Sequence, residues 1–195
     1  MSQADRNKWD ARYRQGSYQA RTHPTELLVE WLPRLPRGRV LDVACGAGRN
    51  SVYLAEAGYE VDAIDISSVA LDRLRETAQA RGVKVSCTET DLESCVLPNQ
   101  NYDLIVMARY TQPSLVPTLL RLLRAGGHFL CEVHLVTDRE VSGPSDPAFR
   151  MAPNELLKLA AELQVLFYRE AIVEDPDGGQ SALAQLVACR VTAGC

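Results

Sequence analysis

The chain has 195 residues, of which 46% are hydrophobic and 24% are charged, as is typical of one domain around a single core. The first ten residues lack the apolar segment of a signal peptide, and no stretch approaches the ~18 apolar residues of a membrane helix, so we expect a soluble, cytoplasmic protein. The net charge of −4 argues against a general nucleic-acid binder. Six cysteines without a Cys-x-x-Cys pair argue against structural zinc, so we expect reduced, mostly buried thiols and no metal.

The positive charge is concentrated at the N-terminal end of the chain. Residues 1–40 hold eight Lys and Arg against four Asp and Glu. Two interpretations are open: a solvated, arginine-rich helix, or a mildly cationic lid that attracts anionic substrates. We treat residues 1–195 as a single domain in which residues 1–36 form an N-terminal helical lid.

Helix-like and strand-like segments alternate along the chain. Trp9 and Tyr13 belong to an N-terminal helical region, and Pro24 opens a second helix. Ser67 is a predicted N-cap, and Gly58 and Gly82 are predicted helix ends. Further helices are predicted over 49–57, 67–80, 115–123 and 153–162, and strands over 40–43, 60–64, 83–87, 102–107, 128–134, 163–173 and 182–191.

Two glycine-rich segments predict turns in the second half of the chain. Gly126-Gly127 is expected to be a turn before the strand 128–134, and residues 175–179 are expected to join the last two strands. Two strands joined by a tight turn form a hairpin, so one of them must run antiparallel to the sheet. The fold class is therefore α/β, with a doubly wound, mostly parallel sheet between covering helices.

The most informative segment is the Gly-x-Gly formed by Gly46 and Gly48, which follows the strand 40–43. Neither residue has a Cβ, so the backbone can turn tightly and come close to a ligand. Asp65, nineteen residues after Gly46, lies where a carboxylate can accept hydrogen bonds from both ribose hydroxyls. A dinucleotide site would have a third glycine in place of Ser51, so no pyrophosphate is demanded. The alternative is a structural strand-to-helix turn without a ligand.

Longer motifs carry a resemblance to a known family. Residues 40–50, Val-Leu-Asp-Val-Ala-Cys-Gly-Ala-Gly-Arg-Asn, resemble motif I of class I S-adenosylmethionine-dependent methyltransferases. The resemblance covers nearly the whole chain, is closest to the small bacterial tellurite-resistance and thiopurine-type methyltransferases, and implies a seven-stranded sheet. Its other marks are Trp9-Asp10-x-Arg12-Tyr13, Asp65-Ile66-Ser67, Thr90-Asp91-Leu92-Glu93, Tyr102-Asp103-Leu104-Ile105 and Pro153-Asn154-Glu155-Leu156-Leu157.

The resemblance also implies roles at an S-adenosylmethionine site. Asp42 would stand near the methionine amino group, Asp65 would bind the ribose and Ile66 would pack on the adenine. Asp91 and Leu92 would contact the adenine amino group and ring. An ionised carboxylate accepts hydrogen bonds and an exocyclic amine donates them, although an Asx-turn is the alternative role for Asp91. The remaining candidates lie in the glycine loop and at the end of the fourth strand: Cys45, Gly46, Gly48, Asn50 and Ala108.

The segment 108–113 bears on the acceptor of the methyl group. It lacks the Asn/Asp-Pro-Pro-aromatic signature of amine- and base-methylating relatives. The chain also lacks the Pro-Cys dipeptide of cytosine C5 chemistry and the Asp-Asn pair of the metal-assisted catechol type. These features favour a soft nucleophile, such as a thiolate or a reduced selenium or tellurium anion, because it attacks carbon without strong base assistance.

Two residues are candidates for contact with the acceptor. Arg109 either holds an anionic acceptor or is a surface side chain. His134, at the end of the fifth strand, is either a base or a hydrogen-bonded structural residue. The sequence thus predicts methyl transfer from S-adenosylmethionine to a small soft nucleophile, with O- or N-methylation of a small metabolite, or cofactor binding without turnover, as alternatives. We expect a small-molecule substrate, no nucleic-acid or membrane partner, and a monomer or homodimer.

Overall fold

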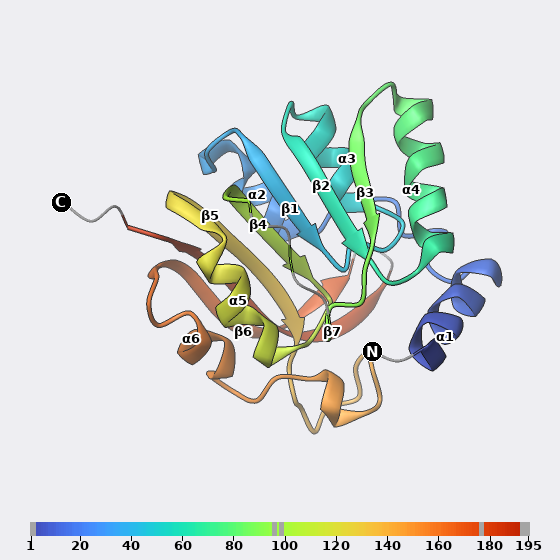
Figure 1. Ribbon diagram of the computed structural model, residues 1–195. Helices are drawn as coiled ribbons and strands as arrows, with labels where there is room; N and C mark the ends of the chain where they lie inside the picture. The colour runs from blue at the N-terminus through green and yellow to red at the C-terminus, as the bar shows by residue number, and fades with distance from the viewer. Residues whose placement is uncertain (1–2, 95–96, 98–99, 176–177, 192–195) are drawn as a thin grey trace.

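The structure is a computed structural model that describes residues 3–94, 97, 100–175 and 178–191. A seven-stranded sheet with the order β3-β2-β1-β4-β5-β7-β6 lies between helices (Figure 1). The strands are β1 (Arg39–Val43), β2 (Glu60–Asp65), β3 (Val85–Glu89), β4 (Tyr102–Ala108), β5 (Leu123–His134), β6 (Gln164–Asp175) and β7 (Gly179–Cys189). The helices are α1 (Gln3–Arg14), α2 (Glu26–Trp31), α3 (Arg49–Glu56), α4 (Ser68–Arg81), α5 (Val116–Arg121) and α6 (Glu155–Leu159).

The strand directions confirm the predicted fold class. Neighbouring strands from β3 to β5 are all parallel, whereas β7 runs antiparallel to both β5 and β6. The β6–β7 pair begins at Asp175 and Gly179, so the predicted C-terminal hairpin is also confirmed. The carboxyl ends of β1, β2 and β4 lie at the same end of the sheet, and α1 lies near that end (Figure 1).

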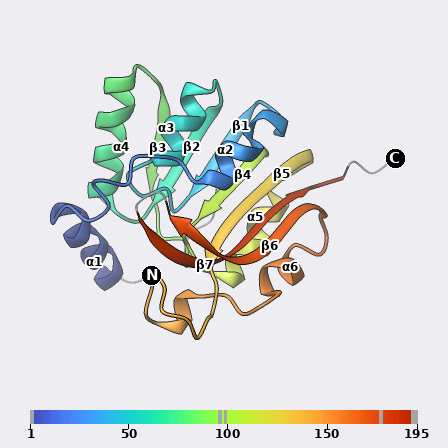
Figure 2. The ribbon, with the colours of Figure 1, turned by 180° about the vertical axis from the view of Figure 1, so that it is seen from behind.

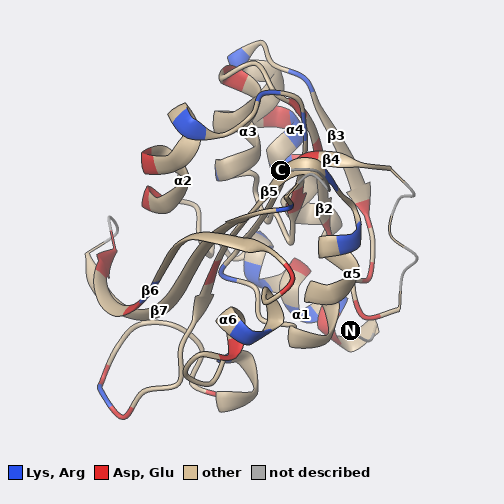
Figure 3. Ribbon diagram, turned by 90° about the vertical axis from the view of Figure 1, so that its left-hand side faces the viewer, with Lys and Arg blue, Asp and Glu red and all other residues tan. Residues whose placement is uncertain are grey.

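Alternating side chains of the central strands form two apolar layers. Leu104 and Val106 of β4 pack on the face covered by α2 and α3, which Figure 2 shows from behind. Ile105 and Met107 pack on the opposite face, under α5. Most charged residues lie on the helices, the loops and the strand ends, as Figure 3 shows. The central strands of the sheet are therefore buried on both faces, and their ends are the places where polar groups can gather.

Local sequence signals correctly predict where several helices begin and end. The Ser67 side chain accepts a hydrogen bond from the backbone N–H of Ala70 at 3.2 Å, so it is the N-cap of α4. Gly82 ends that helix with φ +68°, in the left-handed region that favours glycine. Gly58 follows α3 with φ +87°.

The expected turn at Gly126-Gly127 was wrong. Both glycines lie inside β5, which begins at Leu123 and pairs there with Tyr102 before the register shifts. Gly126 has φ +79°, so the pair forms an irregularity within the strand instead of ending it. Other elements begin and end at different residues from those expected. The helix expected over 115–123 is α5, the strand expected over 83–87 is β3, the helix expected over 153–162 is α6, and the strand expected over 182–191 is β7.

Four of the six cysteines are described, and all four are free thiols. Cys131 is fully buried, whereas Cys45, Cys87 and Cys189 are partly buried. Cys95 and Cys195 lie outside the described residues. Within the described ranges, no helix is both long enough and apolar enough to cross a bilayer.

Candidate cofactor and acceptor site

The glycine loop between β1 and α3 runs across the ends of two strands. Ala44, Gly46 and Gly48 all have positive φ, at +53°, +56° and +81°. The backbone N–H of Cys45 donates to the carbonyl of Ile64 at 3.1 Å, which ties this loop to the end of β2. The predicted turn chemistry is therefore present, because two of the three left-handed positions are glycines.

Protein side chains use the space that the two glycines leave. A Cβ on Gly46 would collide with the hydroxyl of Tyr13, and a Cβ on Gly48 would collide with the side chain of Leu74 in α4. The sequence attributes both glycines to close approach of a ligand. At Gly48 the structure adds a packing reason, because a Cβ there would meet the side chain of Leu74 in α4.

Asp65 lies beside this loop at the end of β2. One carboxylate oxygen accepts from the N–H of Gly46 at 2.8 Å, and the other accepts from the N–H of Ser67 at 2.9 Å. Burial raises the pKa of Asp65, although these backbone donors partly oppose the shift. Each oxygen keeps further acceptor capacity, so the carboxylate can still accept hydrogen bonds from ribose hydroxyls.

Asp42, at the carboxyl end of β1, is almost completely buried. Its carboxylate accepts a hydrogen bond from the Ser51 hydroxyl at 2.5 Å. Burial raises the pKa of Asp42 to about 7, and the Ser51 hydrogen bond only partly opposes that shift. A buried carboxylate with a neutral partner suits a nearby ammonium group, which would favour its ionised form. This environment fits the methionine amino group of S-adenosylmethionine.

The remaining predicted cofactor residues surround the same strand ends. Ile66 and Leu92 are buried. Asp91 accepts a hydrogen bond from the N–H of Glu93 at 2.9 Å, so the Asx-turn that we considered as an alternative is present. The side-chain amide of Gln112 donates to the carbonyl of Leu92 at 3.3 Å and joins the loops after β3 and β4.

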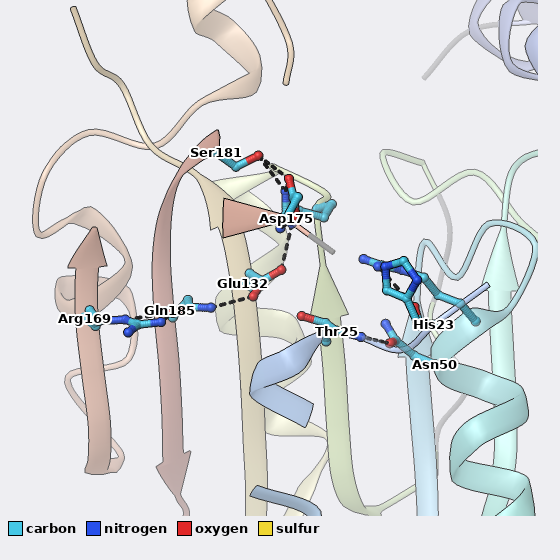
Figure 4. A network of polar contacts seen from close by, with 10 residues as sticks. His23, Thr25, Asn50, Glu132, Arg169, Asp175, Ser181 and Gln185 are labelled. Atoms are coloured by element: carbon cyan, nitrogen blue, oxygen red, sulfur yellow. Dashed lines mark hydrogen bonds and ion pairs between the residues drawn. The ribbon is translucent and has the colours of Figure 1, made fainter. Parts of the chain in front are cut away.

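Asn50, Cys45 and Ala108 have different surroundings. The side-chain oxygen of Asn50 accepts from the N–H of Thr25 at 2.9 Å, so it links α3 to the residue before α2 (Figure 4). Burial raises the pKa of Cys45 well above its ordinary value, so its thiol stays protonated and is no nucleophile. Ala108 ends β4 opposite Glu132 of β5, directly before Arg109.

Arg109 lies at the centre of a buried polar network with Glu132, Asp175 and Ser181. Figure 4 labels these three partners. Its Nε donates to Glu132 at 2.7 Å, and its two terminal nitrogens donate to Asp175 at 2.7 and 3.2 Å. Ser181 accepts from Arg109 at 3.1 Å and donates to Asp175 at 2.5 Å. Burial alone would lower the pKa of Arg109, but Glu132 and Asp175 raise it above its ordinary value.

The network continues across the sheet and borders a small cavity. Gln185 of β7 donates to Glu132 at 2.6 Å, and Arg169 of β6 donates to Gln185 at 2.7 and 3.0 Å (Figure 4). The small cavity beside Glu132 and Gln185 is also lined by Arg49, the first residue of α3. The network thus joins the ends of β4 and β5 to the C-terminal hairpin, and the cavity lies between it and the start of α3.

His134, the last residue of β5, lies close to these charges. Burial lowers the pKa of His134 to about 4, and the positive charges of Arg109 and Arg150 add to the shift. Its Nδ1 is buried without a hydrogen-bond partner among the described residues. A Cβ on Gly143 would collide with the imidazole, so the loop after β5 lies directly over this ring. His134 is a neutral imidazole at physiological pH.

The structure therefore brings the predicted residues to the carboxyl edge of the sheet, where Asp42 and Asp65 lie beside the glycine loop and Arg109 and His134 follow β4 and β5. Several residues of the Arg109 network were not predicted from the sequence. Glu132 had a detectable signal, because it is an acidic residue inside the apolar strand 129–133. The missed residues are Glu132, Asp175, Ser181, Gln185 and Arg169.

Comparison with known proteins identifies the family. Residues 40–127 match the family described as methyltransferase domain. The chain is 31% identical over 143 residues to the probable S-adenosyl-L-methionine-dependent methyltransferase TehB of Haemophilus influenzae, covering 70% of this chain and 49% of that protein. The crystal structure of TehB from Haemophilus influenzae matches with a TM-score of 0.75 at 27% identity, over 93% of this chain and 66% of that chain. The chain belongs to the class I methyltransferase family.

The cofactor of this methyltransferase family is S-adenosylmethionine, and the charges and hydrogen-bonding groups of Asp42 and Asp65 fit it. A further relative is the sarcosine/dimethylglycine N-methyltransferase of Aphanothece halophytica, 26% identical over 166 residues, which are 80% of this chain and 58% of that protein. The methyltransferase described here spans about half the length of the TehB proteins that it matches.

Proposed function

We propose that this chain transfers a methyl group from S-adenosylmethionine to a small soft nucleophile, such as a thiol or a reduced tellurium or selenium species. The cofactor supplies a methyl group bound to a sulfonium sulfur. The protein then has to hold the acceptor in line with that methyl group and exclude water. In this proposal Asp42 and Asp65 orient the cofactor, and the ends of β4 and β5 face the acceptor.

One observation supports the proposed class of methyl acceptor. Neither of the two residues predicted to contact the acceptor, Arg109 and His134, is available as a strong base. The guanidinium of Arg109 is already bound by two carboxylates, so an anionic acceptor would compete with Glu132 and Asp175 for it. His134 has a pKa of about 4, so it is a weak base, and the loop at Gly143 covers it. An acceptor that is already ionised or highly nucleophilic needs little from either group.

The second candidate is O- or N-methylation of a small metabolite. His134 favours this candidate. Its imidazole is neutral at physiological pH, and its Nδ1 lacks a hydrogen-bond partner among the described groups. The relative that methylates sarcosine and dimethylglycine, by its name, is compatible with this alternative. We further expect a cytoplasmic protein that acts on a small molecule without nucleic acid, as a monomer or homodimer.

The test is a panel of acceptors assayed by release of S-adenosylhomocysteine. Small thiols and reduced selenium or tellurium species should outrun primary amines and alcohols at equal concentration. Asp65→Ala should weaken S-adenosylhomocysteine binding by ~1 to 3 kcal/mol and serves as the cofactor-site control. Faster turnover with amines would move the assignment to N-methylation, and no turnover with any acceptor, despite tight cofactor binding, would favour a binding protein.

A further inference from the structure

A tyrosine of the N-terminal helix lies directly over the glycine loop. Tyr13 is in the last turn of α1, and its side chain is only 8% exposed. Its hydroxyl occupies the position that a Cβ on Gly46 would need. Burial raises the pKa of Tyr13, and the nearby carboxylate of Asp65 raises it further. The phenol is therefore protonated and can donate a hydrogen bond.

Polar contacts hold α1 against the segment that follows Asp65. The Asp10 carboxylate accepts from the Ser67 hydroxyl at 2.7 Å. The Arg73 side chain donates to the carbonyl of Tyr13, and Arg6 forms an ion pair with Glu89 at 2.9 Å. These contacts come from α4 and from the end of β3, so they fix Tyr13 relative to Asp65. Arg6, a basic residue of α1, is thus used for docking the helix.

The hydroxyl of Tyr13 lacks a partner of its own. Within the part of the chain that the structure describes, no group forms a hydrogen bond with it, and only burial and nearby charges act on its pKa. The hydroxyl is not among the fully buried polar atoms that lack a partner, so it keeps some access to solvent and can still donate to a ligand. It lies beside Gly46 and near Asp65, two residues predicted to bind the cofactor.

We propose that Tyr13 is a cofactor-binding residue whose hydroxyl donates a hydrogen bond to an oxygen of S-adenosylmethionine. The acceptor oxygen belongs either to the carboxylate of the methionine part or to a ribose hydroxyl. Residues 1–36 then act as more than a cover, because α1 contributes directly to the cofactor site. The inference rests on the cofactor alone, so it is independent of the proposed acceptor.

Tyr13→Phe tests the proposal, because it removes the hydroxyl and keeps the ring between Arg73 and Tyr18. The dissociation constant for S-adenosylhomocysteine, measured by calorimetry, should rise roughly five- to twentyfold, as expected for one lost hydrogen bond. The Tm of the ligand-free protein should stay unchanged or rise, because no native hydrogen bond is lost. A lower Tm with unchanged affinity would overturn the proposal and leave Tyr13 a packing residue.

Tyr18→Phe is the matched control. Tyr18 packs against Tyr13 in a tilted arrangement with ring centroids 5.9 Å apart, but it is 42% exposed. Its loss of a hydroxyl should change neither the affinity nor the Tm. An equal loss of affinity in both variants would contradict a specific role for Tyr13.

A second ligand distinguishes the two oxygens. 5′-Methylthioadenosine has the ribose but lacks the amino-acid part. If Tyr13→Phe weakens binding of both ligands, the hydroxyl contacts the ribose; if it weakens only S-adenosylhomocysteine, the hydroxyl contacts the carboxylate. Wild-type affinity for both ligands would overturn the assignment. Acceptor and turnover play no part in this measurement, so its failure would leave the proposed reaction untouched.

Discussion

Arg109, directly after β4, and Asp175, the last residue of β6, form a two-point ion pair across 66 residues of sequence. Arg109 has φ +62°, an unfavourable value for a residue with a side chain. Its backbone N–H also donates to the carbonyl of Glu132 at 2.6 Å. The network therefore holds the first residue of the β4–α5 loop in a conformation that it would not adopt alone.

Removing this cation should destabilise the protein. Arg109→Ala leaves Glu132, which is 2% exposed, without its charged partner, so the free energy of unfolding in urea should fall by about 3 kcal/mol. Arg109→Ala combined with Glu132→Gln should recover part of this loss. Arg124→Ala, which breaks a more exposed pair with Asp103, is the control and should cost less than about 1 kcal/mol. Unchanged stability with a raised KM for an anionic acceptor would instead support direct contact between Arg109 and the acceptor.

Cofactor affinity should depend on pH through Asp42. With a pKa of about 7, this carboxyl is mostly neutral at pH 6, but the methionine ammonium favours its ionised form. Binding of S-adenosylhomocysteine should therefore release a proton below pH 7 and weaken as pH falls, by at most about tenfold per unit. Calorimetry at pH 6, 7 and 8 measures the slope, which Asp42→Asn should flatten. An identical slope in the variant would assign the proton to another group, such as Asp65, whose pKa is also raised.

Gly48→Ala should destabilise the fold through two effects. Its φ is +81°, and the new Cβ would meet Leu74, so we expect a loss of about 3 kcal/mol in thermal or urea unfolding. Gly58→Ala is the matched control, because φ is +87° there and no atom lies within 4 Å of the added Cβ. It should cost only about 1 kcal/mol. Equal losses at both sites would show that Leu74 moves away without cost.

His134→Ala should lower turnover less than about tenfold if the acceptor supplies its own anion. The imidazole is already neutral above pH 5, because its pKa is about 4, so it should add no inflection between pH 6 and 9. Over that range the rate with a thiol should follow the thiolate fraction. His128→Ala, in the middle of β5, is the control. A loss of a hundredfold or more confined to His134→Ala would make it a general base and favour O- or N-methylation.

Local signals explain what the sequence predicted well. The glycine loop, the Ser67 cap and the hairpin that pairs Asp175 with Gly179 depend on neighbouring residues, so a short segment contains the information for each. The turn predicted at Gly126-Gly127 was wrong because a glycine pair occurs both in turns and in strand irregularities. The pairing of β5 with Tyr102, which is distant in sequence, determines which of the two forms. Arg109 was recognised as a candidate, but its partners on β5, β6 and β7 depend on tertiary packing that spacing cannot show.

The Arg109 network also bears on the order in which the chain folds. β1, β2 and β3 with their connecting helices need only the first half of the chain, whereas Asp175 and Ser181 follow after more than 60 further residues. During synthesis from the N-terminus, β1, β2 and β3 can thus assemble before Asp175 and Ser181 are available to bind Arg109. We expect Arg109 to take its left-handed conformation after the last hairpin docks, because Asp175 and Ser181 hold its side chain. We expect hydrogen exchange after refolding to protect the amides of β1 and β2 before that of Arg109.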